Sequence, residues 1–238
     1  MGLVLRSLTL GLFLLAITLP AVGEDLYRDV PPRKGSYTPQ HHMHRPGQSG
    51  EWALQAKPVN RGFFQPVRIE VPTEGLVSFY SSEQQQPILA QAPAQAGMLV
   101  GRLYRFRIAG MPEYPGVELY PTVEILSRMH TPVGREEEFP IPIFISEDEI
   151  EMVLKNQMVN KVIYLEAPQT ASPIAQEERG IVTFDIPSQR NLLDAAHQLG
   201  RPMAILRIGG RQPDPNNPFD ELLRATAPVR VAPLAPSE

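Results

Sequence analysis

The sequence predicts a mainly β protein: an antiparallel, β-sandwich-like domain with two short helices, flanked by flexible proline-rich arms. Three observations support this prediction. Polar and apolar residues alternate in several segments, as in strands with one buried and one exposed face. Helix-capping signals are few. Apolar residues make up 42% of the 238 residues, which is enough for a core. A small α+β domain is the alternative fold.

Most expected strands lie in a globular domain that we place at residues 62–210. The alternating or apolar segments are residues 67–71, 104–108, 117–119 with 123–125, 162–165, 180–186 and 203–208. If Ile108 and Val117 face each other across the intervening loop, Arg107 lies opposite Glu118 on the exposed surface. Two segments are expected to be loops: residues 81–97, which contain five glutamines, and residues 167–179.

Residues 139–145 predict a strand at the edge of a sheet. Pro140 and Pro142 are two residues apart, so both missing N–H donors fall on the same side of the strand. The amides of Ile141 and Ile143 point to the other side and can still pair with a neighbour. The proline side therefore stays unpaired and blocks the addition of another chain.

Two helices are expected inside the domain. Ser146 and Glu149 have the spacing of a capping box ahead of an apolar stripe. Ser188 is the expected N-cap of the second helix, whose apolar stripe and terminal glycine are Leu192, Ala196, Leu199 and Gly200.

The N-terminus has the three parts of a secretory signal peptide, at residues 1–23. Arg6 provides the positive charge, residues 8–19 form an apolar run, and Ala21 and Gly23 are the small residues at positions −3 and −1. We therefore expect cleavage after Gly23. The run is shorter than the ~20 residues of a membrane-spanning helix, so the mature chain should have no such segment. An uncleaved anchor is the alternative.

Proline-rich segments flank the domain on both sides. Residues 24–61 have little periodicity and are expected to form a flexible linker arm. Residues 211–238 are expected to form a proline-rich tail, with a short helix near residues 218–225 that Asn217 caps.

Charge and cysteine content exclude several classes of protein. The formal net charge is −4, from 22 basic and 26 acidic residues, which argues against a nucleic-acid partner. The absence of cysteine excludes disulfides, cysteine nucleophiles, thiolate metal sites and lipid attachment at a lipobox. An exported protein without disulfides fits a bacterial envelope better than a small eukaryotic secreted domain.

Two clusters are candidate metal ligands. His41, His42 and His44, together with Met43, suit copper or nickel, but three neighbouring histidines do not by themselves form a rigid tetrahedral site. A solvated linker is the alternative interpretation. The second cluster offers oxygen ligands for Ca²⁺ but lacks the glycine and spacing of a calcium loop, and helix capping also explains it: Asp214, Asn216, Asn217, Asp220 and Glu221.

No catalytic or cofactor-binding residue is assigned. The Gly-x-Ser-x-Gly, Ser-x-x-Lys and His-Glu-x-x-His motifs do not occur in the sequence. Two histidines lie near polar residues but lack a partner at catalytic spacing: His130 beside Ser127 and Arg128, and His197 near Asp194. Two acidic groups could act as paired carboxylates or hold a cation, although a loop and a first helical turn account for them: Glu136, Glu137 and Glu138, and Glu147, Asp148, Glu149 and Glu151.

A basic surface is the last candidate site. It would consist of arginines on neighbouring strands and an outward-facing tyrosine: Arg102, Arg105, Arg107 and Tyr120. Such a surface could bind an acidic glycan or a protein partner. Glu118 and Glu124 on adjacent segments would neutralise much of its charge.

Three segments carry a resemblance to known proteins. They are residues 61–69, residues 120–126 together with residues 139–143, and residues 200–210. Together they resemble a group of uncharacterised exported proteins of planctomycete-type bacteria. The resemblance excludes both arms and implies a bacterial setting, and it carries over no activity, ligand or site residue.

We therefore expect an exported, non-enzymatic β domain of the bacterial cell envelope, with a structural or interaction role and an envelope protein or glycan as partner. The expected location is the periplasm or the cell exterior. The alternative is an extracytoplasmic hydrolase or carbohydrate-acting enzyme whose site residues are dispersed in the sequence.

Overall fold

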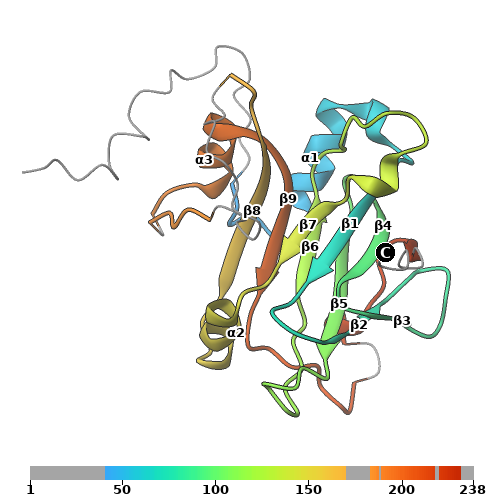
Figure 1. The fold of residues 1–238 in the computed structure, drawn as a ribbon, viewed down its shortest axis with the longest axis vertical. Coiled ribbons are helices and arrows are strands. Elements are labelled where there is room, and N and C mark those ends of the chain that lie inside the picture. Colours follow the sequence, from blue (N-terminus) through green and yellow to red (C-terminus); the bar gives the residue numbers. More distant parts are fainter. Residues whose placement is uncertain (1–40, 170–182, 188, 218–219, 232–238) are drawn as a thin grey trace, which may run out of the picture. The chain divides into compact units, whose positions relative to one another are not determined.

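The computed structural model describes residues 41–169, 183–187, 189–217 and 220–231 (Figure 1). These residues form a mainly β structure of two antiparallel-rich sheets, as the sequence predicts. The expected signal peptide and the first part of the linker arm lie outside the described residues, as do Ser188 and residues 218–219.

One sheet has four strands in the order β10-β4-β1-β7, and the other has six in the order β3-β2-β5-β6-β9-β8. The strands of the first sheet are β1 (Phe64–Glu70), β4 (Ala94–Leu99), β7 (Ile141–Phe144) and β10 (Val229–Val231). Those of the second are β2 (Leu76–Phe79), β3 (Ile88–Gln91), β5 (Leu103–Ala109), β6 (Thr122–Ile125), β8 (Val159–Glu166) and β9 (Gly200–Ile208). Among these strands, β1 and β7 are the only parallel neighbours.

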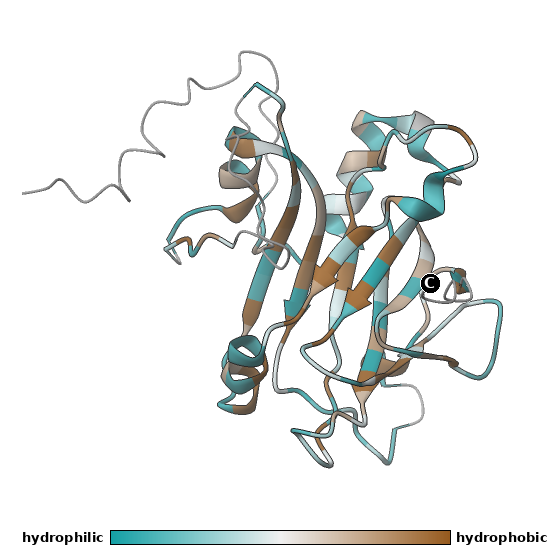
Figure 2. Cartoon of the chain, viewed as in Figure 1, coloured by the Kyte–Doolittle hydropathy of each residue, from teal (hydrophilic) through white to brown (hydrophobic). Residues whose placement is uncertain are grey.

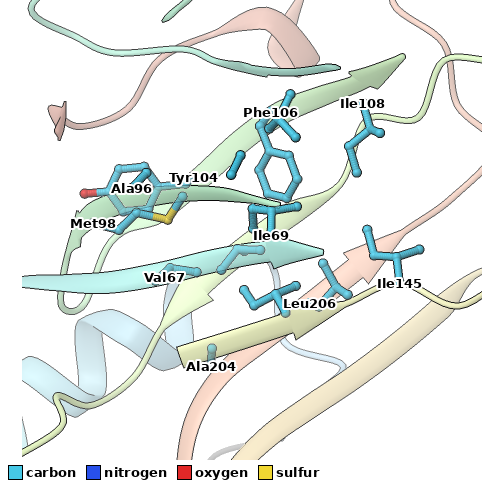
Figure 3. Close-up of a cluster of buried hydrophobic side chains, with 14 of the residues drawn as sticks. Val67, Ile69, Ala96, Met98, Tyr104, Phe106, Ile108, Ile145, Ala204 and Leu206 are labelled. Atoms are coloured by element: carbon cyan, nitrogen blue, oxygen red, sulfur yellow. The ribbon is translucent and has the colours of Figure 1, made fainter. Parts of the chain in front are cut away.

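The core lies between the two sheets. Val67 and Ile69 of β1 point toward Phe106 of β5 and Leu206 of β9, and each of these side chains is fully buried (Figure 3). In Figure 2 hydrophobic and hydrophilic colours alternate along several strands. Burial of one such hydrophobic side chain contributes about 1.5–3 kcal/mol to the stability of the fold.

The hairpin prediction is confirmed for its ion pair and wrong in its register. Arg107 Nη1 lies 3.2 Å from Glu118 Oε1, as expected. Ile108, however, pairs with Leu119 and not with Val117. The Val117 amide donates to the carbonyl oxygen of Tyr114 at 3.1 Å, so Val117 belongs to the turn and the strand pairing begins two residues later.

The edge-strand prediction is confirmed. Strand β7 lies at the end of the four-stranded sheet, with β1 as its neighbour. Ile141 and Ile143 are buried in the core, whereas Pro142 is half-buried.

The prediction that residues 81–97 form a loop is wrong for the second half of this range. That half contains β3 and the first residues of β4. Ala94, Ala96 and Met98 of β4 alternate as buried residues with partly exposed ones. Alanine and glutamine have weak β propensity, so this alternation is difficult to recognise in the sequence. The strand expected at residues 180–186 is absent from its described part, because residues 183–187 adopt no regular structure.

The predicted helix caps differ in accuracy. Helix α2 (Glu147–Leu154) begins at Ser146 with the complete capping box that its sequence predicts. Helix α3 (Leu192–Leu199) has Asn191 as its N-cap, where Ser188 was expected, because the Asn191 side chain accepts from the amide of Leu193.

Both expected arms contribute to the folded domain within the described residues. Residues 48–56 of the expected linker form helix α1 (Gln48–Ala56), and residues 58–60 form a 3₁₀ turn. In the tail, β10 pairs with β4, and the Tyr104 hydroxyl donates to the carbonyl oxygen of Pro228 at 3.2 Å. The tail helix is a 3₁₀ turn at Glu221–Leu223, and Asp220 rather than Asn217 caps it.

Candidate functional site

A group of buried polar side chains lies on the face of the six-stranded sheet that points away from the core. Because side chains alternate along a strand, Glu124 of β6 and Arg207 of β9 lie on the opposite face from Val123 and Leu206. Arg207 Nη1 donates to Glu124 Oε2 at 3.0 Å. Glu124 is fully buried and Arg207 is 5% exposed, so this is an ion pair of the interior.

Helix α1 covers this ion pair and takes part in it. The Gly50 amide donates to Glu124 Oε1 at 2.6 Å. A Cβ atom at Gly50 would lie 3.0–3.2 Å from backbone atoms of Gly101, so the absence of a side chain permits this close approach. Both oxygens of the Glu124 carboxylate are therefore engaged, one by an arginine and one by the helix.

His42 connects the same ion pair to helix α3. Arg207 Nη2 donates to the His42 carbonyl oxygen at 3.1 Å. The ring Nδ1 of His42 lies 3.1 Å from the Leu192 amide nitrogen, which donates to it, and 3.3 Å from Asn191 Oδ1. The Asn191 Oδ1 accepts from the His42 amide at 3.3 Å. We call the four residues that make these contacts the clamp cluster: His42, Glu124, Asn191 and Arg207.

The clamp cluster holds the N-terminal segment, residues 41–56, against the six-stranded sheet. Its hydrogen bonds join residues far apart in the chain, from His42 to Leu192 and from Gly50 to Glu124. A charged pair this deeply buried is stable only if its hydrogen-bonding capacity is satisfied, and both oxygens of Glu124 and both terminal nitrogens of Arg207 have partners. We interpret the clamp cluster as a structural feature that stabilises the packing of this segment, rather than as a reactive centre.

The pH dependence of stability should report on His42. Burial lowers its pKa, and the charges of His41 and Arg207 lower it further, whereas the bond with Asn191 opposes the shift. The unfolded chain therefore binds a proton more readily than the folded chain. The stability that neutral His42 contributes is complete above about pH 6.5 and is lost as the pH falls below that value.

Denaturation at pH 7.5 and pH 5.5 measures this effect. The free energy of unfolding should fall more steeply in the wild type than in His42→Gln, by at most about 1.4 kcal/mol per pH unit for one proton. Burial and the charges of Arg201, Arg128 and Lys57 lower the pKa of His130 in both proteins, so this effect cancels. Equal slopes in the two proteins would contradict the assignment.

The histidines expected to bind metal pack in other ways. The rings of His41 and His42 stack at 4.5 Å, and His44 packs edge-on against Trp52 at 4.9 Å. His41 Nδ1 accepts from the Met43 amide at 3.1 Å. No group of three or more histidines, cysteines or acids that could hold a metal ion occurs among the residues for which coordinates are described. Metal binding by this segment stays a prediction.

The two acidic groups are engaged locally. Arg135 pairs with Glu138, and Lys155 pairs with Glu151 at 3.1 Å. Glu149 completes the capping box of α2 and also contacts Lys161 Nζ at 2.6 Å. The groups are not brought together as a pair of facing carboxylates by any contact of the described residues.

The expected calcium ligands act as caps. Asp220 Oδ1 accepts from the Leu222 amide at 2.8 Å, and Asp220 Oδ2 accepts from the Asp214 amide at 3.0 Å. These bonds lower the pKa of Asp220. Asp214 Oδ1 in turn accepts from the Asn216 amide at 2.9 Å.

The two remaining histidines lie on different elements, His130 in the segment after β6 and His197 in α3. His130 Nδ1 lies 3.1 Å from Nη1 of Arg201, a basic neighbour. Ser127 beside it is buried. His197 is in the last turn of α3 and Asp194 is in the first.

The expected basic surface does not form as a unit. Arg105 is 9% exposed and pairs with Glu221 at 2.6 Å, while Arg107 pairs with Glu118. Tyr120 is buried, and its hydroxyl donates to Glu118. Glu124 was expected to neutralise this surface and lies instead in the clamp cluster.

Sequence reasoning missed the clamp cluster. Glu124 and Arg207 each occupy a polar position in an alternating strand, which indicates an exposed face. The available signal was their opposite charge on two strands that become neighbours, but the order of strands in the sheet was not known from the sequence. Gly50 gave no signal, because its amide rather than a side chain makes the contact.

Comparisons with known proteins add no relative. Neither a family model, nor a curated protein, nor a solved structure matches the chain. None of the helices in the described part of the chain combines the length and the apolar character needed to cross a bilayer.

Proposed function

We propose that the chain is an exported, non-enzymatic β-sandwich domain of the bacterial cell envelope that acts by interaction rather than catalysis. The observation that carries the proposal is the signal-peptide pattern of residues 1–23, with Arg6, the apolar run and the small residues before Glu24. The resemblance to exported bacterial proteins supports the same setting.

The arrangement of the polar groups supports a binding role over a catalytic one. Glu124 and Arg207, which form a buried ion pair, use their polar atoms on each other and on the N-terminal segment. A catalytic acid or base needs contact with a substrate, and a carboxylate at 0% exposure has none in this conformation.

Cleavage after Gly23 is compatible with this fold. The clamp contacts begin at His42, so processing would leave residues 24–40 ahead of the segment that packs on the sheet. Removal of residues 1–23 takes away none of the contacts described for the clamp cluster.

N-terminal sequencing of the protein from fractionated cells tests export. The mature form should begin at Glu24 and be found outside the cytoplasm. Gly23→Phe should block processing, because position −1 requires a small residue, whereas Val22→Phe at position −2 should be processed normally. A protein that begins at Met1 in the cytoplasmic fraction would overturn the proposal.

A further inference from the structure

Basic side chains act on His130 near the end of the six-stranded sheet where β9 begins, away from the clamp ion pair. We call these side chains and His130 the basic cluster, which consists of Lys57, Arg128, His130 and Arg201. Arg201 and His130 are in contact, with Arg201 Nη1 3.1 Å from His130 Nδ1. Strand pairing explains the arrangement: Ile125 pairs with Ala204, and the Leu126 amide donates to the Met203 carbonyl at 2.8 Å, which extends the pairing toward Arg128 and Arg201.

Arg128 packs against an aromatic ring and forms no hydrogen bond among the residues that the structure describes. Its guanidinium carbon lies 5.1 Å from the centre of the Phe63 ring. Its Nε is buried and has no hydrogen-bond partner. A guanidinium stacked on an aromatic ring is fixed in orientation and keeps its terminal nitrogens available as a fork of donors.

The basic cluster lacks acidic partners among the residues whose positions are described. Six other arginines pair with a carboxylate within 4 Å: Arg68, Arg105, Arg107, Arg135, Arg207 and Arg211. Arg128 and Arg201 have no such pair. Burial lowers the pKa of His130, and the positive charges of Arg201, Arg128 and Lys57 lower it further.

We propose that the basic cluster binds a tetrahedral oxyanion, namely a phosphate or sulfate group. The guanidinium groups of Arg201 and Arg128 and the ammonium group of Lys57 all act on His130, and a dianion matches these three positive charges better than a single carboxylate does. The neutral His130 ring, whose Nδ1 faces Arg201, keeps Nε2–H as a further donor. This site would give the proposed binding role a ligand class, but it does not depend on export.

Titration of the purified protein with inorganic phosphate and, separately, inorganic sulfate tests the site. At constant ionic strength, at least one of the two ions should bind saturably and raise the Tm, while acetate should bind at least tenfold more weakly. Arg128→Gln/Arg201→Gln should reduce the affinity at least tenfold, since each charge-assisted hydrogen bond contributes about a factor of ten or more.

The matched control removes two arginines that already have acidic partners. Arg68→Gln/Arg135→Gln causes the same change in net charge, and Arg135 also lies over a phenylalanine ring, at 5.8 Å from the Phe139 centre. This variant should bind the ion as the wild type does. Three results would each overturn the proposal. The two double variants could bind the ion with equal affinity, acetate could bind as tightly as phosphate and sulfate, or neither ion could bind saturably.

Two further measurements keep the test decisive. Arg201→Lys keeps the charge but loses the planar fork, and it should bind more weakly than the wild type and more tightly than the double variant. Dextran sulfate tests whether the site binds a free ion or a group carried on a polymer. If the wild type binds dextran sulfate and Arg128→Gln/Arg201→Gln does not, the result supports the site and identifies its ligand as a sulfated chain. Because N-terminal sequencing measures export, a failure of that proposal and a failure of this one are distinguishable.

Discussion

Replacing Glu124 with glutamine should lower the free energy of unfolding by about 3–5 kcal/mol. The substitution preserves the size of the side chain and removes its charge. It leaves the Arg207 guanidinium, 5% exposed, without a countercharge in the interior. Urea denaturation followed by circular dichroism gives the free energy of unfolding directly.

A matched substitution separates the buried pair from an exposed one. Glu151→Gln removes the partner of Lys155, and both of these side chains are more than half exposed. Its cost should be about 0–1 kcal/mol. The double variant Glu124→Gln/Arg207→Met should recover part of the stability that the single variant loses, because the uncompensated charge is gone. A Glu124→Gln protein within 1 kcal/mol of the wild type would contradict the role of the clamp cluster.

Replacing Gly200 with alanine should cost about 3 kcal/mol, the upper part of the range for overpacking. Gly200 begins β9 opposite Glu166 of β8. A Cβ atom at Gly200 would lie 2.0 Å from the carbonyl oxygen of Leu165 and 2.8 Å from its carbonyl carbon. These are backbone atoms of a paired strand, so they can move apart only by disturbing the pairing of β8 with β9.

Gly209 provides the control for this substitution. It lies just beyond the other end of β9, and a Cβ atom there would meet nothing within 4 Å. Gly209→Ala should leave stability unchanged or raise it by up to about 1 kcal/mol, because alanine restricts the unfolded chain. If both alanine variants unfold at the same urea concentration with the same slope, the close approach at Gly200 is not a constraint.

The local signals of the sequence predicted those parts of the fold that depend on neighbouring residues. The alternation around Phe106, the proline spacing in β7 and the capping box at Ser146 each depend on a few adjacent positions, and all three are confirmed. The class of the fold follows from such segments, since alternating strands must bury one face.

Features that depend on distant contacts could not be predicted in the same way. Helix α1 has a weak sequence pattern and is held by the bond from the Gly50 amide to Glu124, 74 residues away. Strand β10 likewise forms through pairing with β4. The proline-rich composition of the tail did not indicate a strand there. The clamp cluster also depends on distant contacts. Glu124 and Arg207 become neighbours only once β6 and β9 lie side by side in the sheet.

The Gly50 amide provides the most direct test of the claim that the N-terminal segment is an integral part of the domain. Hydrogen exchange of this amide can be followed by NMR in the wild type and in Glu124→Gln. The structure predicts that in the wild type it exchanges about as slowly as the amides of β9, and that it exchanges faster in the variant. Exchange as rapid as that of an exposed loop amide in the wild type would contradict the claim.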